Sequence, residues 1–137
     1  MTSDLREVRA EGFNGEITHA EWLPSSATAV AIAKVAPGRH AIITLPITGG
    51  RPHLVYEFET EHDFPGLAVS ADGRMVAFTA PAPDGFFQIF RIPVIGGGTP
   101  VQVTSDPSHK TQPAWSPDGT RIAFTVWSYD AMFYAMQ

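Results

Sequence analysis

The chain contains the same short pattern twice, and this repeat constrains its fold more than any other feature. The stretch "PAWSPDGTRIAFT" at 113–125 is matched by "LAVSADGRMVAFT" at 67–79. Their turns, Ser116–Gly119 and Ser70–Gly73, lie at the same place in each stretch. Internal similarity at a spacing of this size is typical of repeat architectures, so we expect successive copies of one structural unit.

A third copy precedes these two and has diverged at its turn. In "EWLPSSATAVAIAKV", Trp22 takes the place of Val69 and Trp115, and Ser25-Ser26 replaces the Asp-Gly pair. Matching Ala31 to the alanine of the later copies requires one inserted residue in this turn. We therefore expect a single domain over 1–137, with a lone strand at about 5–11 followed by repeat units at about 19–63, 64–109 and 110–137.

Each unit is expected to form a four-stranded antiparallel meander. The first strand is short and apolar, and it ends in a turn where Asp72 or Asp118 accepts hydrogen bonds from turn amides. Gly73 and Gly119 supply the positive φ that such turns need. The second strand is rich in β-branched and aromatic residues, and a Gly-Gly turn follows the third. No stretch combines helical periodicity with helix caps, so the chain is predicted to be all-β.

Four short strands repeated every roughly 40 to 50 residues are the pattern of a β-propeller blade. The stretch 113–125 and the strand "FFQIFRIPVIGG" at 86–97 resemble repeats of the TolB-like β-propeller family, WD-like repeats of the "WSPDG..IAF" type. That family is named for the periplasmic component of the Tol–Pal envelope system. The resemblance implies an all-β, TolB-like propeller segment of about three four-stranded blades. It also implies a non-enzymatic module that docks a peptide segment of a partner protein on its loop face.

Three blades are too few for a closed ring, because closed propellers typically have four to eight. In one interpretation the chain is the remainder of a longer propeller. In the other, two copies form a homodimer with the six blades familiar in the resembled family. The lone strand "LREVRAE" at 5–11 of one copy would then complete the last blade of the other, which ends in "FYAMQ".

Three histidines, His19, His62 and His109, each stand a few residues before the anchor position of a repeat unit. The loops that carry them should converge on one face, around the mouth of the central channel. Imidazoles and carboxylates gathered there could bind a divalent metal or a cationic peptide, although histidines scattered over polar loops would look the same. We predict no metal and no cofactor, and we assign partner binding to Glu16, His19, Glu61, His62, Asp63, His109 and Lys110.

Composition and absent motifs argue against several function classes. Nine basic against fourteen acidic residues give a net charge of −5, and no basic run occurs, which argues against nucleic-acid binding. The chain has no cysteine and no "GxSxG" motif, so a thiol nucleophile, a thiolate metal site and a hydrolase triad lack support. The glycine runs at 49–50 and 96–98 lie between strands and are expected to be hairpin turns rather than phosphate loops.

Localisation and catalysis are less constrained by the sequence. No apolar run is long enough for membrane insertion, and the charged start "MTSDLREVRAEG" has no apolar signal-peptide core. The chain is therefore expected in the cytoplasm as written, or in the periplasm if a leader has been removed. The enzymatic alternatives are the gating propeller of a larger prolyl-oligopeptidase-like serine peptidase and a fragment of a metal-dependent TolB-like polysaccharide lyase.

Overall fold

The computed structural model of the chain describes residues 14–24, 27–62, 66–127 and 132–136, the last of these by their backbone only. The described residues form eleven strands and no helix, so none of them belongs to a helix that could span a membrane. The prediction of an all-β chain is confirmed. The lone strand expected at 5–11 lies outside the described residues.

The strands form three antiparallel sheets that follow one another along the chain. The first sheet has the order β1-β2-β3-β4 and consists of β1 (Glu16–Trp22), β2 (Thr28–Ala36), β3 (Arg39–Pro46) and β4 (His53–Glu59). The second has the order β5-β6-β7-β8 and consists of β5 (Leu67–Val69), β6 (Met75–Pro81), β7 (Phe87–Pro93) and β8 (Val101–Gln102). The third has the order β11-β10-β9 and consists of β9 (His109–Trp115), β10 (Ile122–Trp127) and β11 (Met132–Met136).

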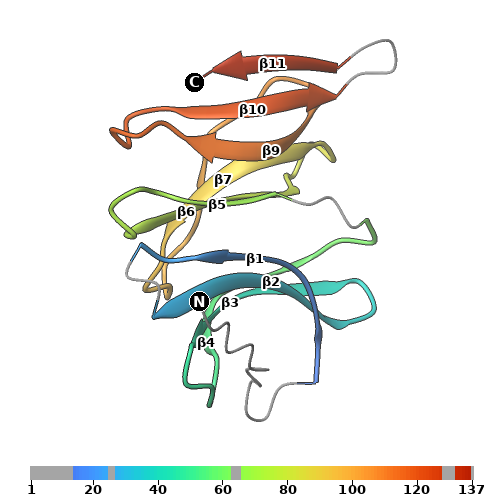
Figure 1. Ribbon diagram of the computed structural model, residues 1–137. Coiled ribbons are helices and arrows are strands. Elements are labelled where there is room, and N and C mark those ends of the chain that lie inside the picture. Colours follow the sequence, from blue (N-terminus) through green and yellow to red (C-terminus); the bar gives the residue numbers. More distant parts are fainter. Residues whose placement is uncertain (1–13, 25–26, 63–65, 128–131, 137) are drawn as a thin grey trace.

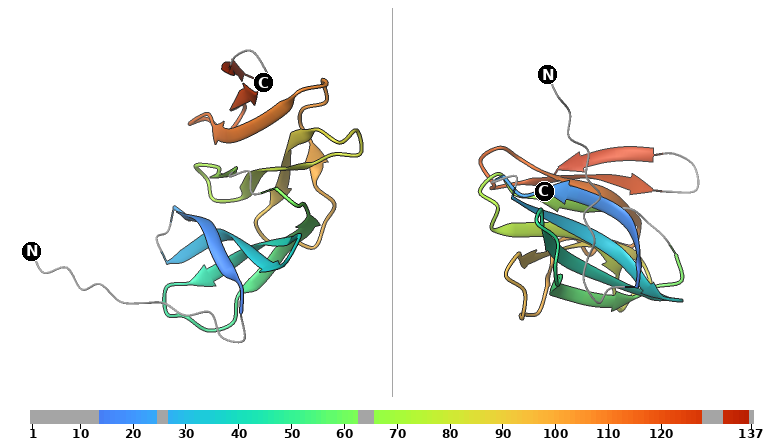
Figure 2. Two further views of the ribbon diagram at one scale, coloured as in Figure 1. Left: turned by 90° about the vertical axis from the view of Figure 1, so that its right-hand side faces the viewer. Right: turned by 60° about the horizontal axis from the view of Figure 1, so that its bottom comes forward.

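The three sheets stack face to face. Figure 1 shows the first sheet at the bottom, in blue to green, and the third at the top, in orange to red. The side view in Figure 2 shows the same order of stacking. Strand β5 contacts β1 on one side and β9 on the other, so the first strands of successive sheets run alongside one another. This arrangement is that of consecutive propeller blades, whose first strands line the central axis.

Each sheet has a leading face, turned toward the preceding sheet, and a trailing face, turned toward the following one. Strand β6 shows how alternate residues of one strand supply the apolar side chains of both faces. Val76 and Phe78 lie on the leading face and pack against the first sheet, whereas Ala77 lies on the trailing face and packs against the third. Successive side chains of a strand point to opposite faces, so a sheet covered on both sides reads as a continuous apolar run. This explains the apolar character of β6.

Two apolar cores hold the three sheets together. Between the first and second sheets, the buried residues are Val30, Ile32, Ile42, Val55, Leu67, Val76, Phe78, Ala80 and Ile92. Between the second and third sheets, they are Ala68, Ala77, Ile89, Ile122 and Phe124. Two hydrogen bonds cross these interfaces at β5: the Glu21 Oε2 atom accepts from the Val69 amide at 3.4 Å, and the Trp115 Nε1–H donates to the Ala68 carbonyl at 3.1 Å.

The turns after the first strands of the second and third sheets have the same hydrogen bonds. Ser70 Oγ donates to Asp72 Oδ1 at 2.7 Å, and Ser116 Oγ donates to Asp118 Oδ1 at the same distance. In both turns the aspartate also accepts from the amide two residues later, and the following glycine has a φ of 74°. Donation from the serine, then from the residue after the glycine, lowers the pKa of both carboxyls, that of Asp118 to about 2.

The turn of the first copy has the same length as the other two, and the expected insertion is wrong. The Leu23 amide donates to the Thr28 carbonyl across this turn, just as Ser70 donates to Met75 in the second copy. Ala31 is therefore the counterpart of Phe78 rather than of Ala77. The shared alanines suggested the wrong alignment, because a comparison of sequences matches residue types and contains no information about hydrogen-bond register.

Candidate functional site

The connections at one end of the stacked sheets form a surface that we call the loop face. It comprises the described residues of four connections, 37–38, 60–62, 82–86 and 103–108. Contacts between successive connections show that they lie at the same end. The Glu61 carboxylate lies against Gly38, and the His62 ring meets the Phe87 ring at the end of the 82–86 connection.

Two of the three histidines singled out from the sequence meet on the loop face. The rings of His62 and His109 both contact the Phe87 ring, with centroids 6.0 Å and 5.5 Å away, and the Phe86 ring lies 5.1 Å from His109. His109 was expected on a loop but is the first residue of β9. We call His62, Phe86, Phe87 and His109 the imidazole–phenyl cluster. The Phe87 amide donates to Nδ1 of His109 at 3.1 Å, which places the proton of the neutral ring on Nε2.

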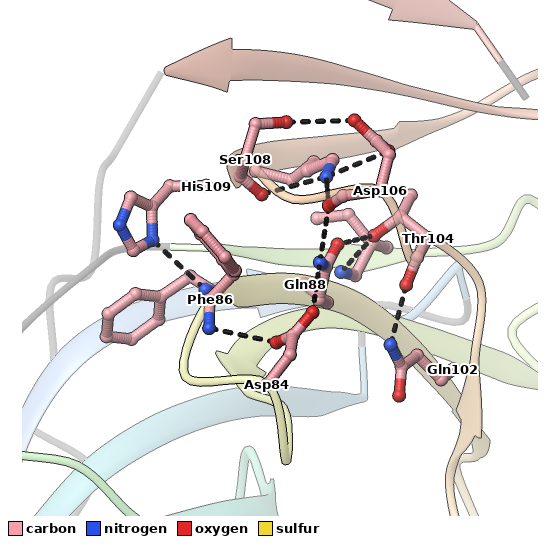
Figure 3. Close-up of polar contacts among 11 residues, drawn as sticks. Asp84, Phe86, Gln88, Gln102, Thr104, Asp106, Ser108 and His109 are labelled. Carbon is pink, nitrogen blue, oxygen red and sulfur yellow. Dashed lines mark hydrogen bonds and ion pairs between the residues drawn. The ribbon is translucent and has the colours of Figure 1, made fainter. Parts of the chain in front are cut away.

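A buried polar network holds the 103–108 connection beside this cluster (Figure 3). Gln88 is fully buried on β7; its Nε2 donates to the Asp106 carbonyl at 2.9 Å, and its Oε1 accepts from Thr104 Oγ1 at 2.6 Å. Thr104 Oγ1 in turn accepts from the Ile89 amide at 2.9 Å. A buried amide that has partners for both its nitrogen and its oxygen fixes the backbone around it. The loop therefore has a defined conformation without secondary structure of its own.

Lys110 belongs to this network and is fully buried. Its ammonium donates to the Asp106 carbonyl at 2.6 Å and to the Ser108 carbonyl at 2.8 Å, and it forms an ion pair with Asp106 Oδ1 at 2.9 Å. These three acceptors match the three protons of an ammonium group. Donation from Lys110 is the main reason that the pKa of Asp106 is lowered. Lys110 therefore braces the loop, and its charge does not reach the surface.

An open hollow of about 460 Å³ lies on the loop face next to His62, lined by Pro37, Gly38, Arg39, Glu59, Thr60 and Glu61. The Thr60 amide donates to the Gly38 carbonyl at 2.9 Å and joins the two connections that form the hollow. Arg39 is paired with the carboxylate of Glu57. The exposed carboxylates of Glu59 and Glu61 consequently give the hollow an acidic character.

Of the other residues assigned from the sequence, Glu16 and His19 lie on β1, outside both the imidazole–phenyl cluster and the hollow. Glu16 is exposed at the start of β1, where its register partner is Lys34. His19 was expected on a loop but lies within β1, and its Nε2 is 3.4 Å from Glu21 Oε1. Asp63 lies outside the described residues. Among the side chains that the structure describes, no three His, Asp or Glu residues come close enough to hold a metal ion.

Sequence reasoning missed the phenyl groups of the cluster and the lining of the hollow. Phe86 and Phe87 were included in a strand, and their position at the end of a hairpin beside His109 depends on the pairing of β6 with β7. The one available signal was the pair of adjacent aromatic residues directly after the Asp84-Gly85 turn. Of the hollow's six lining residues, only Glu61 was assigned to partner binding from the sequence.

Comparison with known proteins identifies the fold. No protein-family model and no curated protein matches the sequence. Among solved structures, the putative TolB from Agrobacterium tumefaciens is similar with a TM-score of 0.70 and 24% identity, over 94% of this chain and 45% of that one. An oligogalacturonate lyase in complex with manganese gives a TM-score of 0.72 at 14% identity, over 98% of this chain and 38% of that one.

The β-propeller domain of Cps50 from Myceliophteria thermophila gives a TM-score of 0.59 at 15% identity, over 86% of this chain and 37% of that one. The chain is thus similar to β-propellers, including a TolB-like protein, and spans less than half the length of each of these three. Its predicted fold, an all-β segment of a β-propeller, is confirmed. At these identities the likeness concerns the fold alone, because propellers serve many functions.

Proposed function

We propose that the chain is a segment built of TolB-type repeats that acts as a non-enzymatic docking module, binding a peptide segment of a partner protein on its loop face. The observation that carries this proposal is the combination of an open acidic hollow with loops held by a buried network. A surface whose loops are already ordered loses little conformational freedom when a ligand binds. The fold gives this proposal only general support, because propellers commonly bind their ligands on such faces.

The chemistry of the loop face favours a peptide with basic side chains. Glu59 and Glu61 present carboxylates at the hollow, while the one cation of its lining, Arg39, is already paired with Glu57. Lys and Arg side chains form charge-assisted hydrogen bonds with carboxylates, which are stronger than those between neutral groups. The half-buried ring of Phe86 lies further along the same face, where an arginine of the same peptide could stack.

Selection of phage-displayed random peptides on the immobilised chain tests this proposal. Selected peptides should be rich in Lys and Arg, and calorimetry should show at least about tenfold weaker binding to a Glu59→Gln/Glu61→Gln variant, the equivalent of about 1.4 kcal/mol. The matched control is Arg121→Gln, an exposed change in the turn at the other end of the third sheet. Failure to enrich any peptide, or equal binding by the loop-face variant, would refute the proposal.

A further inference from the structure

Two sheet faces have no neighbour in the part of the chain that the structure describes: the leading face of the first sheet and the trailing face of the third. The first of these exposes three large apolar side chains, Ile17 (46%), Trp22 (57%) and Leu54 (50%). The second exposes Trp127 (46%). Several large apolar side chains on one exposed face, as on the first sheet, are a common mark of an interaction site.

The interface between the second and third sheets shows how such faces are covered. Trp115 lies on the leading face of the third sheet and packs against the core that contains Ala68 and Ala77. Its indole Nε1–H donates to the Ala68 carbonyl on the trailing face of the second sheet. The two alanines are buried, and their small side chains leave room for the indole.

Trp22 occupies on the first sheet the position that Trp115 occupies on the third. In the strand register Trp22 is the partner of Ala29, and Trp115 is the partner of Ile122 at the same point of the meander. Both tryptophans therefore lie on leading faces. Trp115 has a sheet in front of it, whereas Trp22 has none among the described residues.

The open trailing face repeats the residues of the covered one. The trailing face of the second sheet carries Ala68, Ala77 and Thr79, and the corresponding positions of the third sheet are Ala114, Ala123 and Thr125. All three residue types are identical. The surface that receives a tryptophan within the chain is thus present a second time, on a face without a neighbour among the described residues.

We propose that a second copy of this chain covers both open faces, so that Trp22 of each copy packs over Ala114 and Ala123 of the other and donates its indole N–H to the Ala114 carbonyl. Closed propellers have about four to eight blades. Three sheets fall short of that range, the six sheets of two copies lie within it, and the nine of three copies exceed it. The pairing is reciprocal, so the two contacts close a ring and leave no face open. This inference is independent of the proposed docking function, because it involves other surfaces.

Light scattering on the 137-residue chain over a range of concentrations tests the inference. The wild-type chain should have twice the mass of the single chain, which is 14.8 kDa. Trp22→Lys and Ala123→Glu should each reduce it to the mass of one chain, because each places a charge on one of the two complementary faces. Ile95→Lys should leave the dimer intact, because Ile95 is an exposed apolar residue (77%) in the turn between β7 and β8.

Mixing the two single-chain variants separates loss of association from loss of folding. In a mixed pair, one contact sets the lysine introduced by Trp22→Lys against the glutamate introduced by Ala123→Glu, and the other contact is wild type. The mixture should therefore regain the doubled mass, with circular dichroism showing that both variants are folded. A wild-type chain that stays single while folded would overturn the inference and would point to another part of a longer polypeptide as the cover for these faces. Larger open-ended oligomers, or a mixture that does not associate, would overturn it too.

Discussion

The leading faces of the third and first sheets carry a tryptophan at the same position but in different surroundings. Around Trp115 the third sheet has Ile122 and Phe124, both buried against the second sheet. Around Trp22 the first sheet has the smaller Ala29 and Ala31. A residue's role in a repeat protein is therefore set by the neighbouring unit as much as by its own, because each unit buries most of its apolar surface against other units.

The largest expected effect comes from a change in a covered leading face. Phe78 is fully buried between the first two sheets, with Phe58 and Phe90 stacked near it. Phe78→Ala should lower the free energy of unfolding by about 3 to 5 kcal/mol, through lost burial and the cavity left behind. Leu54→Ala, on the open face, should cost less than about 0.5 kcal/mol in dilute solution. Urea unfolding measures the free energy of unfolding of both variants. Equal losses would contradict the expected difference between covered and open faces.

A change in the buried polar network that joins β7 to the 103–108 connection should have a smaller effect on stability. Thr104→Val keeps the shape of the side chain but removes the hydroxyl that donates to Gln88 and accepts from the Ile89 amide. We expect a loss of about 1 to 3 kcal/mol, because buried polar groups are left without this partner. Thr99→Val, at an exposed position before β8, is the control and should be nearly neutral. Thermal unfolding followed by circular dichroism distinguishes the two variants.

A direct comparison of the two tryptophans should give a smaller effect. Trp115→Phe removes the N–H that donates to the Ala68 carbonyl and should cost about 0.5 to 1.5 kcal/mol at any protein concentration. Trp22→Phe should have no effect in dilute solution, and its cost should grow as the protein is concentrated. Unfolding curves at a low and a high protein concentration show the difference. Concentration-independent costs for both variants would mean that the two faces do not differ.

The smallest effect concerns pH. The folded pKa of Asp118 is about 2, below its usual 3.8, and that of Asp72 is lowered as well. The folded chain therefore binds fewer protons than the unfolded one, so these groups stabilise the fold above pH 3.8 and lose this contribution as the pH falls through about 2. Asp118→Asn keeps an acceptor oxygen but does not titrate. It should weaken the fall of the melting temperature below pH 3.8, and an unchanged fall would contradict the assignment.

The repeat was predictable because its signals are local. Turn residues such as Asp72 and Gly73 bind only their own turn, and the alternation in β6 follows from the two faces that the strand presents. The register of the first copy was not predictable in the same way. Its strand "TAVAIAKVA" has small residues at the positions of Val76 and Phe78 and a branched one at that of Ala77, so matching residue types favours an alignment shifted by one residue. The hydrogen bond from Leu23 to Thr28 gives the true register.

The candidate site was predictable only in part. The sequence placed His62 and His109 at corresponding points of two repeats, but they meet through Phe87, which belongs to a third segment. Lys110 was expected on a loop, yet it lies in β9, and three oxygen atoms of the preceding loop surround its ammonium. Contacts of this kind depend on which strand ends the fold brings together, and no spacing along the chain encodes them.

Strand β5 has only three residues, yet it is tied on one side to Glu21 and on the other to Trp115. A repeat array whose units touched only through apolar surface could lose its outer sheets one at a time. Here, detaching either outer sheet also breaks a hydrogen bond to the backbone of the central one. The three sheets should consequently melt in a single transition, with the amide of Val69 among the last to exchange its hydrogen for deuterium.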